Sequence, residues 1–564
     1  MKSRRMKVSE ALADALAIEA NGPIFGLMGD ANMAVWDALC KDPRTRMVWA
    51  RHDGAAILMA DGYARATGRL GVATVTCGPG LANGANAILT AARAGTPLVI
   101  FTGEYTADGG KAALQALDQR QFARACEAEF RPLASLDSLA EDIAEGFYTA
   151  RTRQCPVILN MPAALWDAEL PWDWSYQPSS GFVPSQDFAP SGEALAQLVE
   201  QLAAARRPVI VAGRGAVLAG ARSDIESLAE RIGALLATTL IAKGFFDGHP
   251  YDVGVSGAFS SAPTEKLMAE ADFVLGIGAS MNFYTTEGGM LFPNAKLARI
   301  DVKPFPPAIG VVPGQYLQGD ARRTTLALQK ALQAKGASSE GFRTAATREI
   351  LNAPMPQPAR ATDGLDPREL MRELSKCLPP DTQVVSGAGH FWSWSICHLA
   401  LPPGGRFQHT ASFGSIGLGL AHGIGAAVGN PQRTTLVIEG DGSLLQAIQE
   451  LHAAAEQDIP VIVLIMNDSG YGAEVLKMKW KGRDARDAMW KSPDYVALAR
   501  GFGGDGVRIC KESELAAAVA QGMKGKGPFV IDAPISPTLV SDSYSRIFLG
   551  QENQAPLLRP VQAR

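Results

Sequence analysis

The chain of 564 residues has no closely spaced cysteine pair, no long apolar run and no excess of basic residues. Its seven cysteines are scattered without a Cys-x-x-Cys motif, which is typical of reduced thiols in a cytosolic protein. No apolar stretch reaches the roughly 18 residues of a membrane-spanning helix, and no apolar signal core follows the start. The formal charge of −4 does not show the net positive charge that is typical of nucleic-acid-binding proteins. We therefore expect a cytoplasmic protein with neither a membrane nor a nucleic acid as partner.

Two irregular stretches divide a chain that is too long for one hydrophobic core. Residues 172–191 are rich in proline, serine and aromatic side chains, and residues 336–364 contain Ala353-Pro354-Met355-Pro356-Gln357-Pro358. Short apolar runs alternate with helical patterns in each of the segments that remain, which are residues 1–175, 190–335 and 365–555. This alternation predicts three α/β domains, each with a doubly wound parallel sheet. The clearest predicted strands of the first two segments are residues 71–76, 97–101, 208–212 and 273–276.

The most informative pattern lies in the third segment, where an aspartate follows each of two predicted strands. The apolar run 435–438 ends in Glu439-Gly440-Asp441-Gly442-Ser443, and a helix is predicted over 444–456. A second predicted strand, 460–466, leads to Asp468 in Asn467-Asp468-Ser469-Gly470-Tyr471. Parallel strands joined by a helix end at the same edge of a sheet, so we expect the two aspartates to meet there.

This edge has the chemistry of a metal and diphosphate site. Glycines let the backbone approach a phosphate closely, and a helix N-terminus presents free N–H groups to anions. Asp441, Asp468 and the backbone carbonyl of Gly470 offer hard oxygen ligands for Mg²⁺, with diphosphate oxygens and water completing an octahedron.

The whole pattern resembles the signature of thiamine-diphosphate-dependent enzymes, in the group of acetolactate synthase, pyruvate decarboxylase and benzoylformate decarboxylase. The runs that resemble its pyrimidine-binding domain are 25–32, 51–56, 59–66 and 76–83. The resemblance implies a pyrimidine-binding domain at 1–175, a middle Rossmann-like domain at 190–335 and a diphosphate-binding domain at 365–555. It also implies thiamine diphosphate and Mg²⁺ as cofactors. The family usually has Asn where this chain has Asp468, which adds a negative charge beside the diphosphate.

Asp53 falls where the family has a glutamate that hydrogen-bonds the aminopyrimidine ring and promotes activation of the cofactor. The resemblance therefore implies that Asp53 is the activating acid. Its side chain is one methylene shorter, which removes roughly 1.5 Å of reach. The alternative is that Asp53 only caps the following helix, where aspartate is favoured.

Three further residues match catalytic positions of the family. Asp30 matches the aspartate of a Gly-Asp-x-Asn pattern, Gln115 matches a glutamine of acetolactate synthases, and Glu474 falls where pyruvate decarboxylase has a second glutamate. The alternatives are a turn aspartate for Asp30, an exposed helical glutamine for Gln115 and a solvated helical residue for Glu474. A role for Glu474 as proton relay would require burial, which raises a carboxyl pKa.

The remaining matches concern cofactor binding. By resemblance, the carbonyl of Gly414 accepts from the aminopyrimidine and Ile416 wedges the cofactor into its bent shape, the alternative for Ile416 being ordinary core. Gly389 and His390 lie in the loop against the diphosphate, the alternative for His390 being a structural histidine. Gly440, Gly442, Ser443 and Tyr471 complete the expected cofactor-binding set.

The middle segment has a Gly213-Arg214-Gly215 turn after a predicted strand, which alone is weak evidence for nucleotide binding. Acetolactate synthases bind flavin in this domain through an arginine-containing stretch. The corresponding residues 276–283 contain no arginine, so we expect a structural middle domain without a tightly bound flavin.

The resemblance implies cleavage or formation of a C–C bond on a 2-oxo acid or related carbonyl donor, as a decarboxylase or an acyloin-type carboligase. It also implies a homodimer or homotetramer with sites at the subunit interface. Acetolactate synthases carry a tryptophan shortly after the metal motif. In this chain Lys477 falls near that place, and Trp480 is offset from it along the sequence. The alternatives are a catalytically altered cofactor-binding relative and a lyase acting on another carbonyl substrate.

Overall fold

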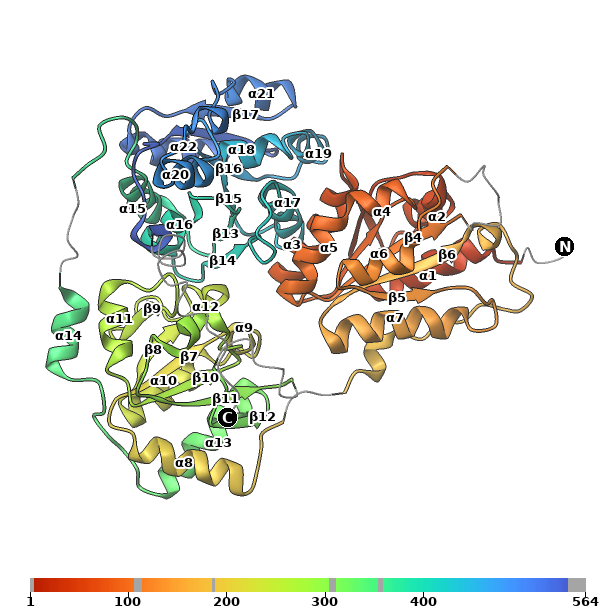
Figure 1. Cartoon of the computed structure of the whole chain (residues 1–564). Coiled ribbons are helices and arrows are strands. Elements are labelled where there is room, and N and C mark those ends of the chain that lie inside the picture. The colour runs from red at the N-terminus through yellow and green to blue at the C-terminus, as the bar shows by residue number, and fades with distance from the viewer. Residues whose placement is uncertain (1–4, 106–113, 185–187, 304–310, 354–358, 546–564) are drawn as a thin grey trace. The chain divides into compact units, whose positions relative to one another are not determined.

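The computed structural model describes residues 5–105, 114–184, 188–303, 311–353 and 359–545 (Figure 1). These residues form three six-stranded parallel sheets with helices between most successive strands. The predicted fold class, three doubly wound α/β sheets, is therefore confirmed. None of the described helices combines the length and the apolar character needed to span a bilayer.

The first sheet has the order β2-β1-β3-β4-β6-β5. Its strands are β1 (Pro23–Gly26), β2 (Arg46–Trp49), β3 (Gly71–Thr74), β4 (Leu98–Glu104), β5 (Glu129–Pro132) and β6 (Pro156–Pro162). The accompanying helices are α1 (Val8–Ala20), α2 (Met33–Lys41), α3 (Asp53–Thr67), α4 (Pro79–Asn83), α5 (Ala85–Ala94), α6 (Gln119–Ala125) and α7 (Leu139–Arg153).

The middle sheet has the order β12-β11-β10-β7-β8-β9, which is the strand order of dinucleotide-binding folds. Its strands are β7 (Pro208–Ala212), β8 (Leu235–Thr238), β9 (Asp252–Val255), β10 (Phe273–Ile277), β11 (Lys296–Asp301) and β12 (Gln315–Gln318). The helices are α8 (Glu193–Ala204), α9 (Arg214–Leu218), α10 (Arg222–Ile232), α11 (Ala262–Ala269), α12 (Phe283–Thr286), α13 (Ala321–Ala334) and α14 (Ala345–Asn352).

The third sheet, β14-β13-β15-β16-β18-β17, repeats the connectivity of the first. Its strands are β13 (Gln383–Ser386), β14 (Arg406–His409), β15 (Thr435–Gly440), β16 (Ile462–Asn467), β17 (Asp505–Arg508) and β18 (Phe529–Pro534). The helices are α15 (Pro367–Cys377), α16 (Trp392–His398), α17 (Gly419–Gly429), α18 (Asp441–Leu445), α19 (Glu450–Glu456), α20 (Gly472–Trp480), α21 (Tyr495–Gly501) and α22 (Leu515–Gly522).

The chain divides into two compact units. One comprises residues 1–184, 381–392 and 408–537, and so contains the first sheet and most of the third. The other comprises residues 185–380, 393–407 and 538–564 and contains the middle sheet. The three domain boundaries predicted from the sequence stay a prediction.

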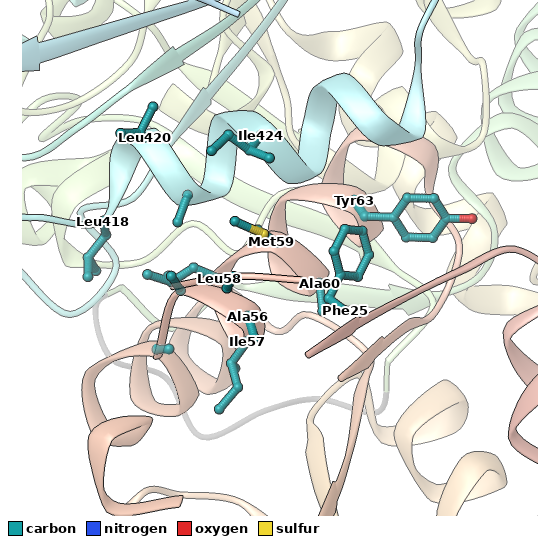
Figure 2. Packing of buried hydrophobic residues seen from close by; sticks show 14 of the residues in the cluster. Phe25, Ala56, Ile57, Leu58, Met59, Ala60, Tyr63, Leu418, Leu420 and Ile424 are labelled. Carbon is teal, nitrogen blue, oxygen red and sulfur yellow. The ribbon is translucent and has the colours of Figure 1, made fainter. Parts of the chain in front are cut away.

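Within the first unit, α3 and α17 pack with their backbones in close contact. A Cβ atom at Gly62 would lie 1.9 Å from the carbonyl oxygen of His422, and one at Gly425 would lie 1.8 Å from that of Met59. Such distances exclude any larger residue at these two positions. Figure 2 shows Met59 facing the helix that carries Ile424, inside one continuous buried cluster. This contact joins two helices that begin next to predicted site residues.

The predicted elements agree closely with the observed strands but include one error. Strand β7 coincides with the prediction over 208–212, and the others differ only at their ends. The helix predicted over 444–456 is wrong, because it is divided into α18 and α19. The N–H groups of Gln446 and Ala447 bond to carbonyls three residues back, so the chain tightens into turns between the two helices.

Candidate functional site

The predicted site residues follow the carboxyl ends of strands in two sheets. Asp30, Asp53 and Gln115 come after β1, β2 and β4 of the first sheet. In the third sheet, His390 follows β13, Ile416 follows β14, Asp441 follows β15 and Asp468 follows β16. Ligands of open α/β sheets bind at this edge, so both groups occupy the expected place.

Asp441 and Asp468 form the most unusual pair at the edge of the third sheet. Strands β15 and β16 are adjacent, with Gly440 opposite Met466, and the two carboxyl groups lie against each other. Burial raises the pKa of both, and the charge of Asp441 raises the pKa of Asp468 further. Asp441 is 1% exposed, and neither of its carboxyl oxygens has a hydrogen-bond partner among the described residues. Asp468 is half-buried, so a buried carboxylate without a hydrogen-bond partner has a second carboxylate against it, and this arrangement fits a cation.

The loop after β16 is held firmly beside these carboxylates. Asn467 donates to Asp532 Oδ1 (2.8 Å), and its own Oδ1 accepts from the N–H of Ser469 (3.1 Å). The backbone of Gly470 lies near both carboxyl groups and pairs with Met489. No group of three or more His, Cys, Asp or Glu side chains suited to a metal occurs in the described part of the chain. A cation here therefore needs further oxygen ligands, which a backbone carbonyl and a diphosphate can supply.

Aromatic rings cover the turn that begins α18. The Tyr471 and Trp490 rings pack edge to face with centroids 4.8 Å apart, and a Cβ at Gly442 would lie 2.8 Å from each side chain. Ser443 Oγ accepts from the N–H of Gly417 at 2.8 Å, which ties this turn to the loop that carries Ile416. Trp490 was not predicted from the sequence, because it is distant from every motif.

His390 and Ile416 occupy different environments. His390 is buried, and burial lowers the pKa of its imidazole to about 4, so the ring is neutral near pH 7. Ile416 is half-buried in the irregular segment between β14 and α17, and it is not part of the buried cluster between α3 and α17. Its role as a wedge stays a prediction. Gly414, two residues earlier, has a φ of 79°, which favours glycine.

The alternative interpretation of Asp53 as a helix cap is wrong. His52 is the N-cap of α3, because its Nδ1 accepts from the N–H of Gly54 at 3.1 Å. Asp53 is the first helical residue, is 7% exposed and accepts from Asn83 Nδ2 at 3.1 Å. A Cβ at Gly80 would lie 2.9 Å from Asp53 Oδ1, so a glycine is needed beside this carboxyl group. The role of Asp53 in activation stays a prediction.

Two buried glutamates that the sequence did not single out support these loops. Both oxygens of Glu450 accept from the N–H of Arg51, at 3.2 and 3.1 Å, and so fix the segment that enters α3. Glu439 precedes the Gly440–Ser443 turn, and its Oε1 accepts from the N–H of Gly419 at 2.7 Å. Burial raises the pKa of each carboxyl to about 7. Both roles depend on contacts between distant segments, which local sequence patterns do not reveal.

The remaining predicted catalytic residues differ in how well their surroundings suit them. Gln115 lies in a turn and not in a helix, and the Cys77 thiol donates to its Oε1 at 3.4 Å. Asp30 is exposed at the start of a short 3₁₀ turn, near Cys77. Glu474 is exposed on α20 and pairs with Lys477 at 3.3 Å, so it lacks the burial expected for a proton relay. The three roles stay predictions.

In the middle sheet, the N–H groups of Gly213 and Gly215 bond to the carbonyls of Ile277 and Gly278, at 3.0 and 2.9 Å. Because those two amides already donate to backbone carbonyls, they do not form a phosphate-binding turn.

Three family models match along the chain. They are the N-terminal, central and C-terminal domains of thiamine pyrophosphate enzymes, at residues 6–122, 195–328 and 387–533. A probable 2-ketoarginine decarboxylase of Pseudomonas aeruginosa is 32% identical over 521 residues, which is 89% of each chain. An acetolactate synthase large subunit of Parasynechococcus marenigrum is 29% identical over 553 residues, covering 93% of this chain and 87% of the relative. The acetolactate synthase isozyme 3 large subunit of Escherichia coli is 26% identical, covering 89% of each chain.

Proposed function

Because the chain belongs to the thiamine pyrophosphate enzyme family, we propose that it uses thiamine diphosphate and Mg²⁺ to cleave or form a C–C bond beside the carbonyl of a 2-oxo acid. The observation that carries the metal assignment is the Asp441–Asp468 pair. Its carboxyl groups, buried in Asp441 and half-buried in Asp468, touch each other and have no basic partner among the described residues. A divalent cation bound by the pair would neutralise that charge.

The residues present fit the cofactor. Asp441, Asp468 and the carbonyl of Gly470 hold the cation, and Gly440, Gly442 and Ser443 let the backbone approach the diphosphate. When bound, thiamine diphosphate supplies a nucleophilic ring carbon and an electron sink for the bond that breaks.

Residues that follow strands of the first and third sheets would orient the rest of the cofactor and move its proton. Asp53 would hold a proton at the aminopyrimidine ring nitrogen, and Glu450 fixes the backbone just before Asp53. Ile416 would pack against the bound cofactor, and the Gly414 carbonyl would accept from its amino group. His390 is neutral and can donate a hydrogen bond to a phosphate or to the substrate without adding charge.

Decarboxylation of a 2-oxo acid is the reaction that we place first, and carboligation with a second carbonyl is the alternative. The relatives include both kinds of enzyme by name. The absence of a tryptophan at Lys477 argues against acetolactate as the product. Asp30, Gln115 and Glu474 are proposed to face the substrate.

We further propose a homodimer or homotetramer in the cytoplasm, with each site shared between two copies. The shared site is what the family resemblance implies. A measured molar mass in solution tests this, and a monomer that binds the cofactor at full strength contradicts it.

A panel of 2-oxo acids tests the reaction. Release of CO₂ is measured with and without aldehyde acceptors, using purified protein supplied with thiamine diphosphate and Mg²⁺. We expect CO₂ release with at least one donor, accompanied by a new circular-dichroism band of the bound cofactor. Cofactor binding without either signal for any donor would favour a catalytically altered relative.

A further inference from the structure

Glu439 is a fully buried carboxyl group at the edge of the third sheet, 1% exposed at the end of β15. Its Oε1 accepts from the N–H of Gly419 at 2.7 Å. The hydroxyl of Ser443 and the N–H groups of Leu420 and Gly440 also lie near this carboxyl group. Its second oxygen, Oε2, has no hydrogen-bond partner among the described residues.

Three loops close around this one carboxyl group. They are the segment 386–390 after β13, the segment 413–419 before α17 and the turn 440–443 after β15, which we call the cofactor cradle. A Cβ at Gly387 would lie 2.1 Å from Glu439 Oε2, and one at Gly419 would lie 2.3 Å from Oε1. Both positions therefore require glycine because the carboxyl group fills the space of a side chain. Any change in the size of Glu439 must alter the separation of these loops.

Glu439 also caps the N-terminus of α17, because it accepts from the N–H of Gly419, the first residue of this helix. The first N–H groups of a helix have no partner within it, and an acidic group at that end is stabilised by the helix dipole. The N-cap residue of α17, Leu418, makes no capping hydrogen bond with its own side chain. Glu439 supplies this acceptor from a neighbouring strand, so the start of α17 is fixed by the strand that leads to Asp441.

We propose that Glu439 is a positioning residue for the cofactor, because its carboxyl group joins the three loops of the cofactor cradle and caps α17. It acts through the backbone of these loops and not by contact with the reacting atoms. The inference rests on the proposed binding of thiamine diphosphate. It predicts that loss of the carboxyl group weakens cofactor binding more than it lowers turnover of the saturated enzyme.

The test compares Glu439→Leu and Glu439→Gln with the wild type in the full-length protein. Leu keeps approximate volume but removes both acceptors, whereas Gln keeps an oxygen that can accept from Gly419. The Kd of thiamine diphosphate is measured by calorimetry at saturating Mg²⁺. We expect Glu439→Leu to raise the Kd about 10- to 100-fold, the scale of a lost buried hydrogen bond to a charged group. Glu439→Gln should stay within about threefold of wild type, as expected for a retained acceptor.

Glu19→Leu is the matched control, because Glu19 is another buried carboxylate that lies outside the cofactor cradle. It is 4% exposed and bonds to Arg151, Tyr176 and Ser179. This variant should lower the melting temperature without changing the Kd. If Glu439→Leu does not fold, Glu439→Asp, which withdraws the carboxyl by roughly 1.5 Å, replaces it with the same expected direction.

The outcomes are distinguishable. An unchanged Kd in Glu439→Leu, or in Glu439→Asp where that variant is used, overturns the positioning role. So does an equal loss of affinity in Glu19→Leu, since the effect would then reflect stability alone. A wild-type protein that binds no thiamine diphosphate refutes the proposed function itself, independently of any variant at Glu439.

Discussion

The carboxyl groups of Asp441 and Asp468 lie against each other at the ends of adjacent parallel strands. Both oxygens of Asp441 lack a hydrogen-bond partner among the residues described, although the side chain is 1% exposed. Burying like charges together is unfavourable unless a proton or a cation compensates them. The pair therefore links the fold of the third sheet to the binding of a divalent cation.

Replacing Asp441 should separate metal binding from folding. Asp441→Ala removes one ligand and relieves the buried like-charge contact, so we expect Mg²⁺-dependent binding of thiamine diphosphate to be lost while the sheet stays folded. Calorimetry measures the binding and far-UV circular dichroism measures the fold. Asp468→Asn is the matched variant, because it keeps an oxygen ligand and should retain binding. Wild-type cofactor affinity in Asp441→Ala would refute the metal assignment.

The middle sheet should carry no flavin. The N–H groups of Gly213 and Gly215 are bonded to carbonyls of the facing loop, and residues 276–283 include no arginine. The proposed chemistry also needs no redox centre. Protein purified without added cofactor should show no stoichiometric absorbance in the yellow flavin bands, and such absorbance would contradict this prediction.

The contact between α3 and α17 should tolerate no side chain at Gly425. The Cβ of Gly425→Ala would lie 1.8 Å from the carbonyl oxygen of Met59, so the helices must separate. We expect a loss of about 3 kcal/mol or more in the free energy of unfolding, at the upper end for overpacked cores. Urea unfolding measures it. Gly501→Ala is the control, because no atom lies within 4 Å of its added Cβ, and its stability should change by less than about 1 kcal/mol.

His409 should make the protein less stable in acid. Burial, with the charge of Arg65 next, lowers the pKa of the folded imidazole to about 3 from an ordinary value of 6.5. Between these values the unfolded chain binds the extra proton, so stability is complete above about pH 6.5 and falls as the pH drops toward about 3. One such group contributes a slope of up to about 1.4 kcal/mol per pH unit.

The measurement is the free energy of unfolding at several pH values between 7.5 and 5, about the range where the unfolded imidazole titrates. In the wild type, His409 Nδ1 accepts from the N–H of Ala411 at 3.2 Å. His409→Asn retains an acceptor for this N–H group. This variant should reduce the slope of the free energy of unfolding against pH by the contribution of up to about one proton. An unaltered slope in His409→Asn would show that other groups cause the acid sensitivity.

Sequence patterns predicted the parts of this site that depend on local order. Apolar runs bounded by glycine marked β7 and β15 nearly to the residue, and the turn after each of two strands indicated that Asp441 and Asp468 share one edge. Local patterns failed where turns compete with helices. Residues 446–449 continue a helical pattern, but tight hydrogen bonds to carbonyls three residues back interrupt the helix.

Contacts between distant segments could not be predicted in this way. Glu439 looks like a strand residue and Glu450 like a helical one, yet each holds backbone N–H groups of a segment far along the chain. The cap of α3 was missed for a different, local reason. Histidine is not among the usual capping residues, yet the His52 imidazole accepts from the N–H of Gly54.

Asp53 should be the acid that activates the cofactor despite its short side chain. Its carboxyl group is buried, is bonded to Asn83 and lies beside Gly80 at the start of α3. Asp53→Ala should nearly eliminate deuterium exchange at the reactive ring carbon of bound thiamine diphosphate. Cofactor affinity should change little, since the diphosphate, the cation and Ile416 are proposed to supply most of it.

Asp53→Glu is the sharper variant, because it restores the residue usual in the family. The Asp53 carboxyl already bonds to Asn83 and would lie 2.9 Å from a Cβ at Gly80. An extra methylene therefore has to displace helix α4, which carries both residues. We expect exchange to fall roughly 10- to 100-fold, the scale for a displacement of about 1 Å at a reacting group. Exchange is followed by NMR of the quenched cofactor, with its Kd measured in parallel to separate chemistry from binding. Faster exchange in Asp53→Glu would instead mean that the wild-type carboxyl is too short for its task. Unchanged exchange in Asp53→Ala would show that another group activates the cofactor and that the role given to Asp53 is wrong.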